Sequence, residues 1–345
     1  MEDKNSNNML KKAIAEERLK AVSFFEDAPC YPVEELVRMW RLGRQLETET
    51  DNKNCMAQLR EFCMLRDSLQ KKENAPQRIY LWPDGRMPVM TEYEDNSDCR
   101  YNHNPDFRPY LYEMLLSEGK EPKGAVVVCA GGDHGDCVLS EGYQTCLDFN
   151  EMGYHSFLLL NRTNRRPWTG QECGADVARA IRMIRASAGR YGIRENQVAF
   201  AGFSNGGLTG EACIRYYSGT QRTADHFPDY MEDELDRYYG APDAFLCIYG
   251  PRYKGAAFDY TNVVYPPVFF AVGREDSALD NLNAVLPDLL AHGVETEVHT
   301  FAGVPHGQGG ITIVGEKTYP NFQLWLQLAD VFLQDVFQRQ RQKQN

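Results

Sequence analysis

A series of short apolar runs, several of them separated by segments with a helical pattern, limits the folds open to this sequence more than any other feature. The runs are continuously apolar, which is typical of strands buried on both faces of a sheet. The segments 174–192 and 319–337 instead repeat apolar residues at helical spacing. Strands that alternate with helices form right-handed βαβ units, so the sequence predicts an α/β fold with a mostly parallel central sheet flanked by helices. The predicted strands are 124–132, 155–163, 197–204, 243–250, 267–273 and 297–303.

The N-terminal part of the chain has a different character. Residues 1–75 are rich in helix formers and mix charged with apolar residues at helical spacing, which predicts two or three helices. A break is expected at 73–77, so we expect a helical N-terminal extension at 1–75 and an α/β domain at 76–345. Just after the break, 79–93 is predicted to form a β-hairpin around a Pro-Asp-Gly turn.

The extension carries more apolar surface than free helices would expose. Leu36, Met39, Trp40, Leu59 and Phe62 all lie within its helical patterns. This surface is expected to pack either on the α/β domain, as a cap over the functional site, or on a second copy of the chain, as a dimerisation arm. Both options stay open at the level of the sequence.

The composition argues against several classes of protein. Lys and Arg number 37 against 49 Asp and Glu, and the resulting net charge of -12 repels phosphate backbones, so nucleic acid is not an expected partner. No apolar run approaches the roughly 18 residues that cross a bilayer, and residues 1–20 lack the apolar core of a secretory signal. The ten cysteines form no C-x-x-C pair, which favours reduced core thiols. We therefore expect a cytoplasmic protein without a membrane partner.

A serine between glycines follows one of the predicted strands. Ser204 lies between Gly202 and Gly206, after the apolar run that begins at Val198 and before a segment with helical character. The pattern G-x-S-x-G between a strand and a helix is typical of a nucleophile elbow, which holds a serine hydroxyl above the edge of a sheet. The alternative is a glycine-rich turn with a solvent-exposed serine, and the flanking strand and helix favour the elbow.

A serine nucleophile needs a base, and on this type of fold the chain order is serine, acid, histidine. Downstream of Ser204 the histidines are His226, His292, His299 and His306. His226 lies in an irregular acidic segment, His292 at the end of a predicted helix, and His299 inside a predicted strand. His306 follows the last predicted strand in a glycine-flanked loop, where catalytic residues collect at the carboxyl edge of a parallel sheet. His306 is therefore the predicted base.

The predicted acid lies in the loop after the strand that ends at Gly273. Asp276 is three residues past this glycine, and its neighbour Glu275 is the second candidate. Asp280 is more typical of a residue that caps the following helix. A solvent-exposed loop carboxylate is the ordinary alternative for each acid. Asp276 is preferred because its loop ends at the same sheet edge as the loops of Ser204 and His306.

Acyl transfer to a serine also needs backbone N–H groups that stabilise the developing oxyanion. One donor is normally the residue after the nucleophile, here Asn205. A second donor is expected from the glycine-rich loop after the strand at 124–132, through Gly132 or Asp133. The alternative for this loop is a simple turn that ends a strand.

The same loop contains residues of the types that bind metals. Cys129, Asp133, His134, Asp136 and Cys137 lie within nine positions of one another. Their spacing matches no standard zinc pattern, and Cys129 ends a predicted buried strand. We therefore expect neither a metal nor another cofactor.

Three arginines follow the predicted strand at 155–163. Arg162, Arg165 and Arg166 could contact an acidic substrate at the carboxyl edge of the sheet. Salt bridges to Asp176 and its neighbours are the favoured interpretation.

The segment from about 79 to 337 resembles the α/β-hydrolase superfamily, and within it the hormone-sensitive-lipase-like and acetylxylan- or feruloyl-esterase-like group. The helix motif D-x-x-R-A-I is intact at 176–181. The elbow motif G-x-S-A-G-G occurs at 202–207 with asparagine in place of the alanine. The oxyanion motif P-G-G-G-[YF] corresponds at 130–134 to Ala-Gly-Gly-Asp-His. Further similarity lies in the segments 241–251, 265–279 and 294–307.

This resemblance implies an α/β-hydrolase fold for 76–345 and the chemistry of a serine carboxylic-ester hydrolase. Ser204 would attack the ester carbonyl, His306 would take and return the proton, and Asp276 would orient the histidine. The chain departs from the group at Asp133, which stands where the family has its third glycine. A carboxylate that pointed inward there would oppose the oxyanion.

The resemblance further suggests a small-molecule or carbohydrate ester as substrate, with a short acyl group such as acetyl on a carbohydrate. The sequence itself specifies neither the acyl group nor the alcohol. One alternative is a prolyl-oligopeptidase-like peptidase with the same triad, although this sequence contains no segment of β-propeller size. Another is a hydrolase-fold binding or scaffold protein, inactive because Asp133 or the N-terminal helices obstruct the site.

Overall fold

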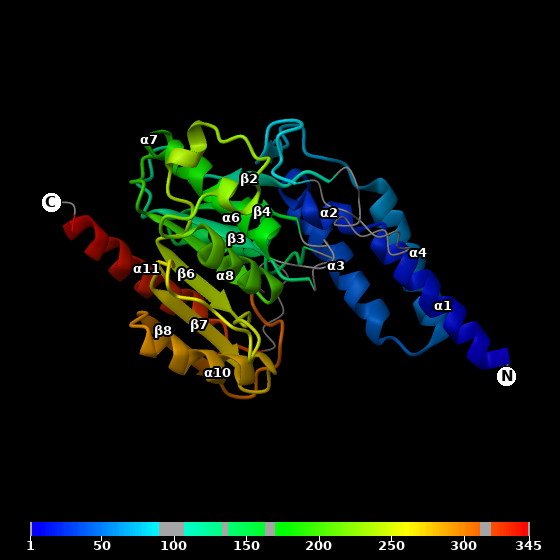
Figure 1. The fold of residues 1–345 in the computed structure, drawn as a ribbon. Helices are drawn as coiled ribbons and strands as arrows, with labels where there is room; N and C mark the ends of the chain where they lie inside the picture. The colour runs from blue at the N-terminus through cyan, green and yellow to red at the C-terminus, as the bar shows by residue number, and fades with distance from the viewer. Residues whose placement is uncertain (1, 90–106, 133–136, 163–169, 311–318, 344–345) are drawn as a thin grey trace.

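The centre of the fold is an eight-stranded sheet with the strand order β1-β2-β4-β3-β5-β6-β7-β8 (Figure 1). β2 pairs antiparallel with both β1 and β4, whereas all pairs from β4 to β8 are parallel. The mostly parallel sheet predicted from the apolar runs is thereby confirmed. The computed structural model describes residues 2–89, 107–132, 137–162, 170–310 and 319–343. The strands are β1 Ile79–Tyr80, β2 Tyr110–Met114, β3 Ala125–Cys129, β4 His155–Leu160, β5 Val198–Phe203, β6 Ala244–Ile248, β7 Val268–Gly273 and β8 Thr296–Phe301.

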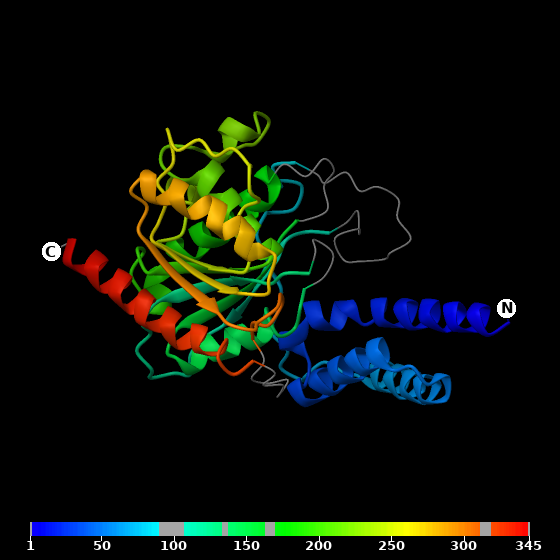
Figure 2. The same ribbon diagram turned by 90° about the horizontal axis from the view of Figure 1, so that it is seen from below.

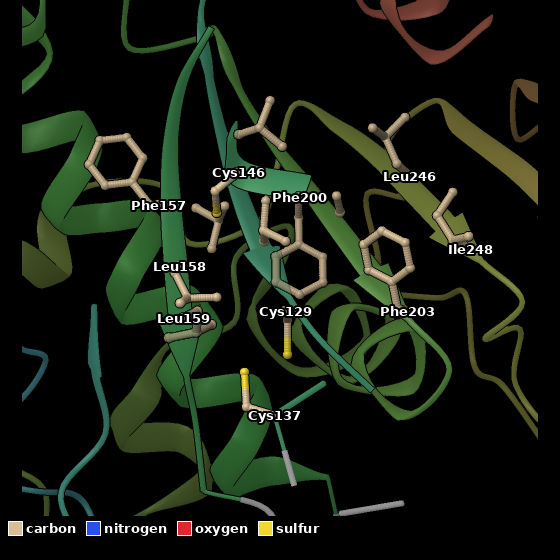
Figure 3. Close-up of a cluster of buried hydrophobic side chains, with 14 of the residues drawn as sticks. Cys129, Cys137, Cys146, Phe157, Leu158, Leu159, Phe200, Phe203, Leu246 and Ile248 are labelled. Atoms are coloured by element: carbon tan, nitrogen blue, oxygen red, sulfur yellow. The ribbon is translucent and has the colours of Figure 1, made fainter. Parts of the chain in front are cut away.

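The strands in the middle of the sheet are buried along their whole length. Every residue of β3, β4, β5, β6 and β7 is buried, while β8 at the edge is mostly half-buried. Figure 3 shows the side chains of Phe157 from β4, Phe200 and Phe203 from β5, and Leu246 from β6. All four form part of this core. Because both faces of the sheet are apolar, both must be covered by helices.

Helices cover both faces of the sheet (Figure 2). α5 and α11 lie on one face, and α6, α8 and α10 lie on the other. α6 and α8 approach closely at Gly174, where a Cβ atom would lie 2.9 Å from the backbone carbonyl carbon of Ala212. The helices of the α/β domain are α5 Tyr143–Glu151, α6 Gln171–Ala186, α7 Ala188–Tyr191, α8 Asn205–Tyr217, α9 Thr223–His226, α10 Ala278–Ala291 and α11 Leu324–Lys343, with a 3-10 turn at Glu234–Arg237.

A buried ion pair joins α6 to the end of β4. The Arg162 guanidinium lies 2.7 Å from the Asp176 carboxylate, and both side chains are completely buried. The Trp82 indole N–H donates a further hydrogen bond of 2.7 Å to the same carboxylate. The interpretation of Arg162 as a partner of Asp176 is therefore confirmed, while Arg165 and Arg166 lie outside the described residues.

The predicted hairpin at 79–93 is wrong in its pairing. The turn exists, because the Arg86 N–H donates to the Pro83 carbonyl at 3.0 Å. However, β1 is only two residues long and pairs with β2, a strand that the sequence patterns did not reveal. The backbone of β1 pairs with β2 of the large sheet instead of with the residues that follow the turn. Tertiary context therefore overrides the local hairpin pattern. Residues 90–93 lie outside the described part of the chain.

The N-terminal helices project from the α/β domain as an elongated group, and the N-terminus lies at the far end of α1 (Figures 1 and 2). They are more numerous than the two or three expected, because one short helix and a 3-10 turn connect the longer ones. α3 is amphipathic and buries Leu36, Met39 and Leu42 on one side. The helices are α1 Glu2–Leu19, α2 Val22–Glu26, α3 Val33–Thr48 and α4 Asn52–Ser68, with the 3-10 turn at Ala28–Cys30.

Asp27 attaches this extension to the edge of the sheet. Its carboxylate accepts hydrogen bonds from the Arg78 guanidinium at 2.8 Å and from the Tyr112 hydroxyl at 2.7 Å. Tyr110 donates a longer bond of 3.3 Å, and Lys71 lies 3.4 Å away. Although burial raises the pKa of Asp27, these hydrogen bonds outweigh it and hold the pKa below its ordinary range.

Candidate active site

Ser204 lies at the turn between β5 and α8 in a strained backbone conformation. Its φ and ψ angles are 50° and -118°, a region that residues other than glycine rarely adopt. The flanking glycines are required by close contacts. A Cβ atom at Gly202 would lie 2.3 Å from the Gly206 carbonyl oxygen, and one at Gly206 would lie 2.2 Å from the Cys129 carbonyl oxygen. The turn thus has the geometry that the G-x-S-x-G pattern predicts.

The structure brings the three predicted side chains together. The Nε2 atom of His306 lies 2.9 Å from Ser204 Oγ, and its Nδ1 atom lies 2.8 Å from Asp276 Oδ2. Because a carboxylate only accepts, Nδ1 carries the proton, which leaves Nε2 of the neutral ring free to accept from the serine hydroxyl. The arrangement is that of a serine, a base and an acid that orients the base.

Asp276 is held rigidly below the histidine. It is 4% exposed, and its second oxygen accepts the Ala278 N–H at 2.8 Å. The Glu275 N–H donates to the Val304 carbonyl at 3.0 Å. This bond connects the loop of Asp276 to the loop that carries His306. The side chain of Glu275 is exposed, so the geometry favours Asp276 over its neighbour.

The other downstream histidines have different surroundings. His226 contacts the Tyr216 carbonyl at 2.7 Å, and His299 contacts its strand neighbour Glu297 at 2.7 Å. The ring of His292 lies 2.8 Å from the Asp288 carbonyl, at the end of α10.

The hydrogen bond to Asp276 changes the acid–base behaviour of His306. It raises the pKa of the imidazole above its ordinary value of about 6.5, and the charges of Asp276 and Glu141 act in the same direction against partial burial. The His306 side chain is 47% exposed, so the ring is also accessible to a small molecule.

The candidate oxyanion donors are described only in part. Asn205 is the first residue of α8, and first-turn N–H groups have no partner within their own helix. Gly132 has φ 137°, a conformation that favours glycine, whereas Asp133 lies outside the described residues. Gly131 lies directly against Ser204, since a Cβ atom at Gly131 would be 2.8 Å from Ser204 Cβ. The oxyanion loop therefore adjoins Ser204, as the sequence predicts.

Two further residues, which the sequence did not indicate, adjoin the site. Glu141 precedes α5 and accepts the Gly131 N–H at 2.7 Å, while Tyr249 follows β6 and donates to Glu141 at 2.7 Å. The available signals were a carboxylate shortly after the glycine-rich loop and an aromatic residue directly after a buried strand. Neither signal shows that the two side chains meet.

A cavity of about 470 Å³ lies between the helical extension and residues 137–139, which follow the oxyanion loop. Its walls are mainly apolar side chains of α1, α2, α3 and α4, with two arginines among them. Lining residues include Leu19, Phe25, Met39, Trp40, Gly43, Phe62, Arg18 and Arg44.

Within the described ranges, no group of three or more His, Cys, Asp or Glu side chains could hold a metal ion. Asp133, His134 and Asp136 of the cluster considered above lie outside these ranges. None of the described helices combines the length and the apolar character needed to cross a membrane.

The sheet and the elbow together define an α/β-hydrolase fold, with Ser204 after β5, Asp276 after β7 and His306 after β8. The crystal structure of an acetyl ester-xyloside bifunctional hydrolase from Caldicellulosiruptor lactoaceticus is similar, with a TM-score of 0.58 and 22% identity over 77% of this chain and 98% of that chain. Esterase 2 of Thermogutta terrifontis, phosphorylated by paraoxon, gives a TM-score of 0.55 and 18% identity over 77% of this chain and 96% of that chain.

Sequence comparison adds one further similar protein. Endo-1,4-beta-xylanase B of Butyrivibrio fibrisolvens is 25% identical over 168 residues, which is 48% of this chain. The matched region spans only 24% of the length of that xylanase. No protein-family model matches the chain.

Proposed function

We propose that this protein is a serine hydrolase of carboxylic esters. The observation that carries the proposal is the continuous series of contacts from Asp276 through His306 to Ser204, at 2.8 Å and 2.9 Å. The fold supports it, because the strand-to-helix turn of an α/β-hydrolase presents a serine hydroxyl to a bound carbonyl.

In the first half of the reaction, Ser204 Oγ attacks the ester carbonyl carbon while His306 Nε2 takes the hydroxyl proton. Asp276 stabilises the imidazolium that forms. The tetrahedral oxyanion is stabilised by backbone N–H groups, for which we propose Asn205 and the loop at Gly132 and Asp133. Collapse of the intermediate breaks the bond to the alcohol, which leaves with the proton from His306.

In the second half, water attacks the acyl group on Ser204. His306 takes a proton from the water and returns it to Oγ as the carboxylic acid departs. This cycle needs no cofactor.

As substrate we propose an ester with a short acyl group, with acetyl on a carbohydrate as the leading example. Support comes from the names of two similar proteins, an acetyl ester-xyloside hydrolase and a xylanase. The site alone does not distinguish the alcohol, so the substrate has to be determined with a series of esters.

Hydrolysis of p-nitrophenyl acetate, butyrate and octanoate, and acetate release from acetylated xylo-oligosaccharides, test this function. Wild type should hydrolyse the acetate esters, and Ser204→Ala should lose activity by roughly 10⁴- to 10⁶-fold with unchanged circular dichroism. Cleavage of peptides without cleavage of esters would favour the peptidase alternative. No turnover of either class by the wild type would favour a scaffold.

We further propose that the helical extension acts as a cap that forms one wall of the substrate site. The cavity between α1, α3, α4 and residues 137–139 supports this role, because those residues follow the oxyanion loop. Gly43→Leu should partly fill the cavity and lower the ratio of octanoate to acetate hydrolysis, whereas Gly43→Ala should leave it unchanged. An unchanged ratio in Gly43→Leu would remove the cap role. A wild-type dimer on size exclusion that becomes monomeric on loss of residues 1–20 would favour the dimerisation arm.

A further inference from the structure

A buried carboxylate fixes the peptide group next to the nucleophile. Glu141 is 4% exposed, and its Oε2 atom accepts the N–H of Gly131 at 2.7 Å. Gly131 in turn lies against Ser204. With its own N–H directed into the protein toward Glu141, Gly131 is not an oxyanion donor, and the following peptide at Gly132 is the first that can face a substrate.

The other oxygen of this carboxylate binds a tyrosine that reaches the histidine loop. Tyr249 donates to Glu141 Oε1 at 2.7 Å, and its hydroxyl oxygen accepts the Gly309 N–H at 3.0 Å. The ring of Tyr249 also packs edge-to-face on the imidazole of His306, with 4.9 Å between the centroids. One side chain therefore contacts both the catalytic ring and the loop that carries it.

The backbone of Tyr249 is strained in a way that matches such a role. Its φ is 40°, and among the described residues other than glycine only Ser204 shares a positive φ. Such conformations cost about 1–3 kcal/mol each and persist where the surroundings impose them. The next residue, Gly250, packs closely against the backbone of Ser204, because a Cβ atom at Gly250 would lie 2.2 Å from the Ser204 carbonyl oxygen.

The ionisable groups that face His306 come from three separate loops. Asp276 follows β7, Tyr249 follows β6, and Glu141 lies between β3 and α5. Burial raises the pKa of the Tyr249 hydroxyl far above its ordinary range, so it remains a neutral donor. Burial also raises the pKa of Glu141, but both of its oxygens accept hydrogen bonds, which suits the carboxylate form.

We propose that Glu141 and Tyr249 form a positioning clamp that holds the oxyanion loop and the His306 loop in register, with the Glu141 carboxylate as a second negative charge that favours protonated His306 during ester hydrolysis. The inference rests on the proposed esterase function. It treats both residues as positioning residues, because their hydrogen bonds are to Gly131, to Gly309 and to each other. The clamp joins segments that are 108 residues apart in sequence.

The test compares Tyr249→Phe and Glu141→Gln with a matched pair of controls. Tyr154 is also fully buried and donates to the Asp330 carboxylate at 2.8 Å. However, it lies directly before β4, at the amino end of the parallel strands and away from Ser204. Tyr154→Phe and Asp330→Asn therefore remove the same kind of hydrogen bond away from the site. Each protein is assayed with p-nitrophenyl acetate across pH, and the His306 pKa is followed by NMR of the imidazole.

We expect the clamp variants to lower kcat by roughly 10- to 100-fold with a much smaller change in KM, as small displacements of catalytic groups do. Glu141→Gln should also lower the His306 pKa and move the acid limb of kcat/KM to lower pH. The control variants should change neither kcat nor the His306 pKa. Because Tyr249→Phe keeps the ring, it tests the clamp even where Glu141→Gln does not fold.

Clamp variants with wild-type kcat and an unchanged His306 pKa, alongside an active wild type and inactive Ser204→Ala, would overturn the clamp but leave the esterase proposal standing. An inactive wild type would instead contradict the esterase proposal. In that case the NMR titration still reports whether Glu141 acts on His306.

Discussion

The molecule uses a buried aspartate in two regions for different purposes. Asp27 attaches the helical extension to the sheet, and Asp276 lies below His306 at the carboxyl edge of the parallel strands. They are 5% and 4% exposed, so the two carboxylates are equally withdrawn from water. The difference lies in their partners, which are the permanent cation Arg78 for Asp27 and the titratable imidazole of His306 for Asp276.

The partner determines what each aspartate can do. A guanidinium stays charged at every relevant pH, so the pair at Asp27 persists and serves as an attachment. An imidazole changes its charge near neutral pH, so the pair at Asp276 can strengthen when a proton arrives and weaken when it leaves. Equal burial therefore gives a structural role in one region and a proposed catalytic role in the other.

The largest effect should come from removing the charge of Asp276. In Asp276→Asn we expect kcat to fall by about 10⁴-fold, because the histidine loses the group that holds its tautomer. The free energy of unfolding should change far less than the activity. The exposed neighbour gives the control, since Glu275→Gln should keep wild-type kcat for p-nitrophenyl acetate. A large loss in Glu275→Gln with an active Asp276→Asn would mean that the acid is assigned one position too far along the chain.

The same change at Asp27 should affect stability instead of catalysis. Asp27→Asn places an amide against Arg78 and should lower the free energy of unfolding by about 2–3 kcal/mol, somewhat less than for a fully buried pair because Arg78 is partly exposed. Urea denaturation measures the loss, and kcat of the remaining folded protein should stay within a few-fold of wild type. Glu61→Gln breaks an exposed ion pair with Arg38 in the same extension and should cost under about 1 kcal/mol. A stability loss as small as this control would reduce Asp27 to an ordinary surface contact.

The activity that depends on the Asp276–His306 pair and the stability that depends on Asp27 should be lost at different pH values. The pKa of His306 is raised, so its pairing stabilises the fold fully below about pH 6.5 and loses this contribution as pH rises through the raised value. Catalysis needs the neutral ring, so kcat/KM should fall as pH drops through that same value, above pH 6.5. The pKa of Asp27 is lowered, so its stabilisation persists above about pH 4 and is lost as pH falls through the lowered value. Activity should therefore disappear at a higher pH than the stability of the attachment, and the reverse order would contradict the comparison.

The smallest effect is expected at Gly43, a glycine inside a helix of the extension, and a crowded glycine after Ser204 provides the contrast. A Cβ atom at Gly43 in α3 would meet its nearest neighbour, Arg18 Nε, at 3.5 Å, an ordinary contact. Gly43→Ala should therefore raise the free energy of unfolding by up to about 1 kcal/mol, as expected for a glycine inside a helix. Gly207→Ala is the contrasting variant at the catalytic edge, because its Cβ atom would lie 2.5 Å from the Gly250 carbonyl oxygen, and it should be destabilising. Thermal unfolding of both variants measures the difference.

The sequence was most informative where local pattern and sheet geometry coincide. Ser204, Asp276 and His306 each follow a strand that the apolar runs predicted, and the carboxyl ends of parallel strands meet at one edge of a sheet. That rule is sufficient to place the three loops together without knowledge of any contact. The glycines around Ser204 add a local requirement that can be read from five consecutive residues.

The features that sequence reasoning missed depend on long-range pairing. β1 pairs with β2, about 30 residues later, and nothing in either short run specifies this partner. Glu141 and Tyr249 meet only because the fold brings together segments 108 residues apart. A carboxylate before a helix and an aromatic residue after a strand each have many possible surroundings, so their contact was not predictable from their types.

The attachment at Asp27 also has a consequence for the order in which the chain is made. Its three strongest partners, Arg78, Tyr110 and Tyr112, lie 51, 83 and 85 residues downstream. During synthesis the extension leaves the ribosome first, and α3 and α4 can pack on each other through local contacts before the tyrosines of β2 are available to this carboxylate. Until β2 emerges, Asp27 can pair with Lys71 and Arg78 but not with the two tyrosines of that strand, so the extension is not yet attached to the sheet.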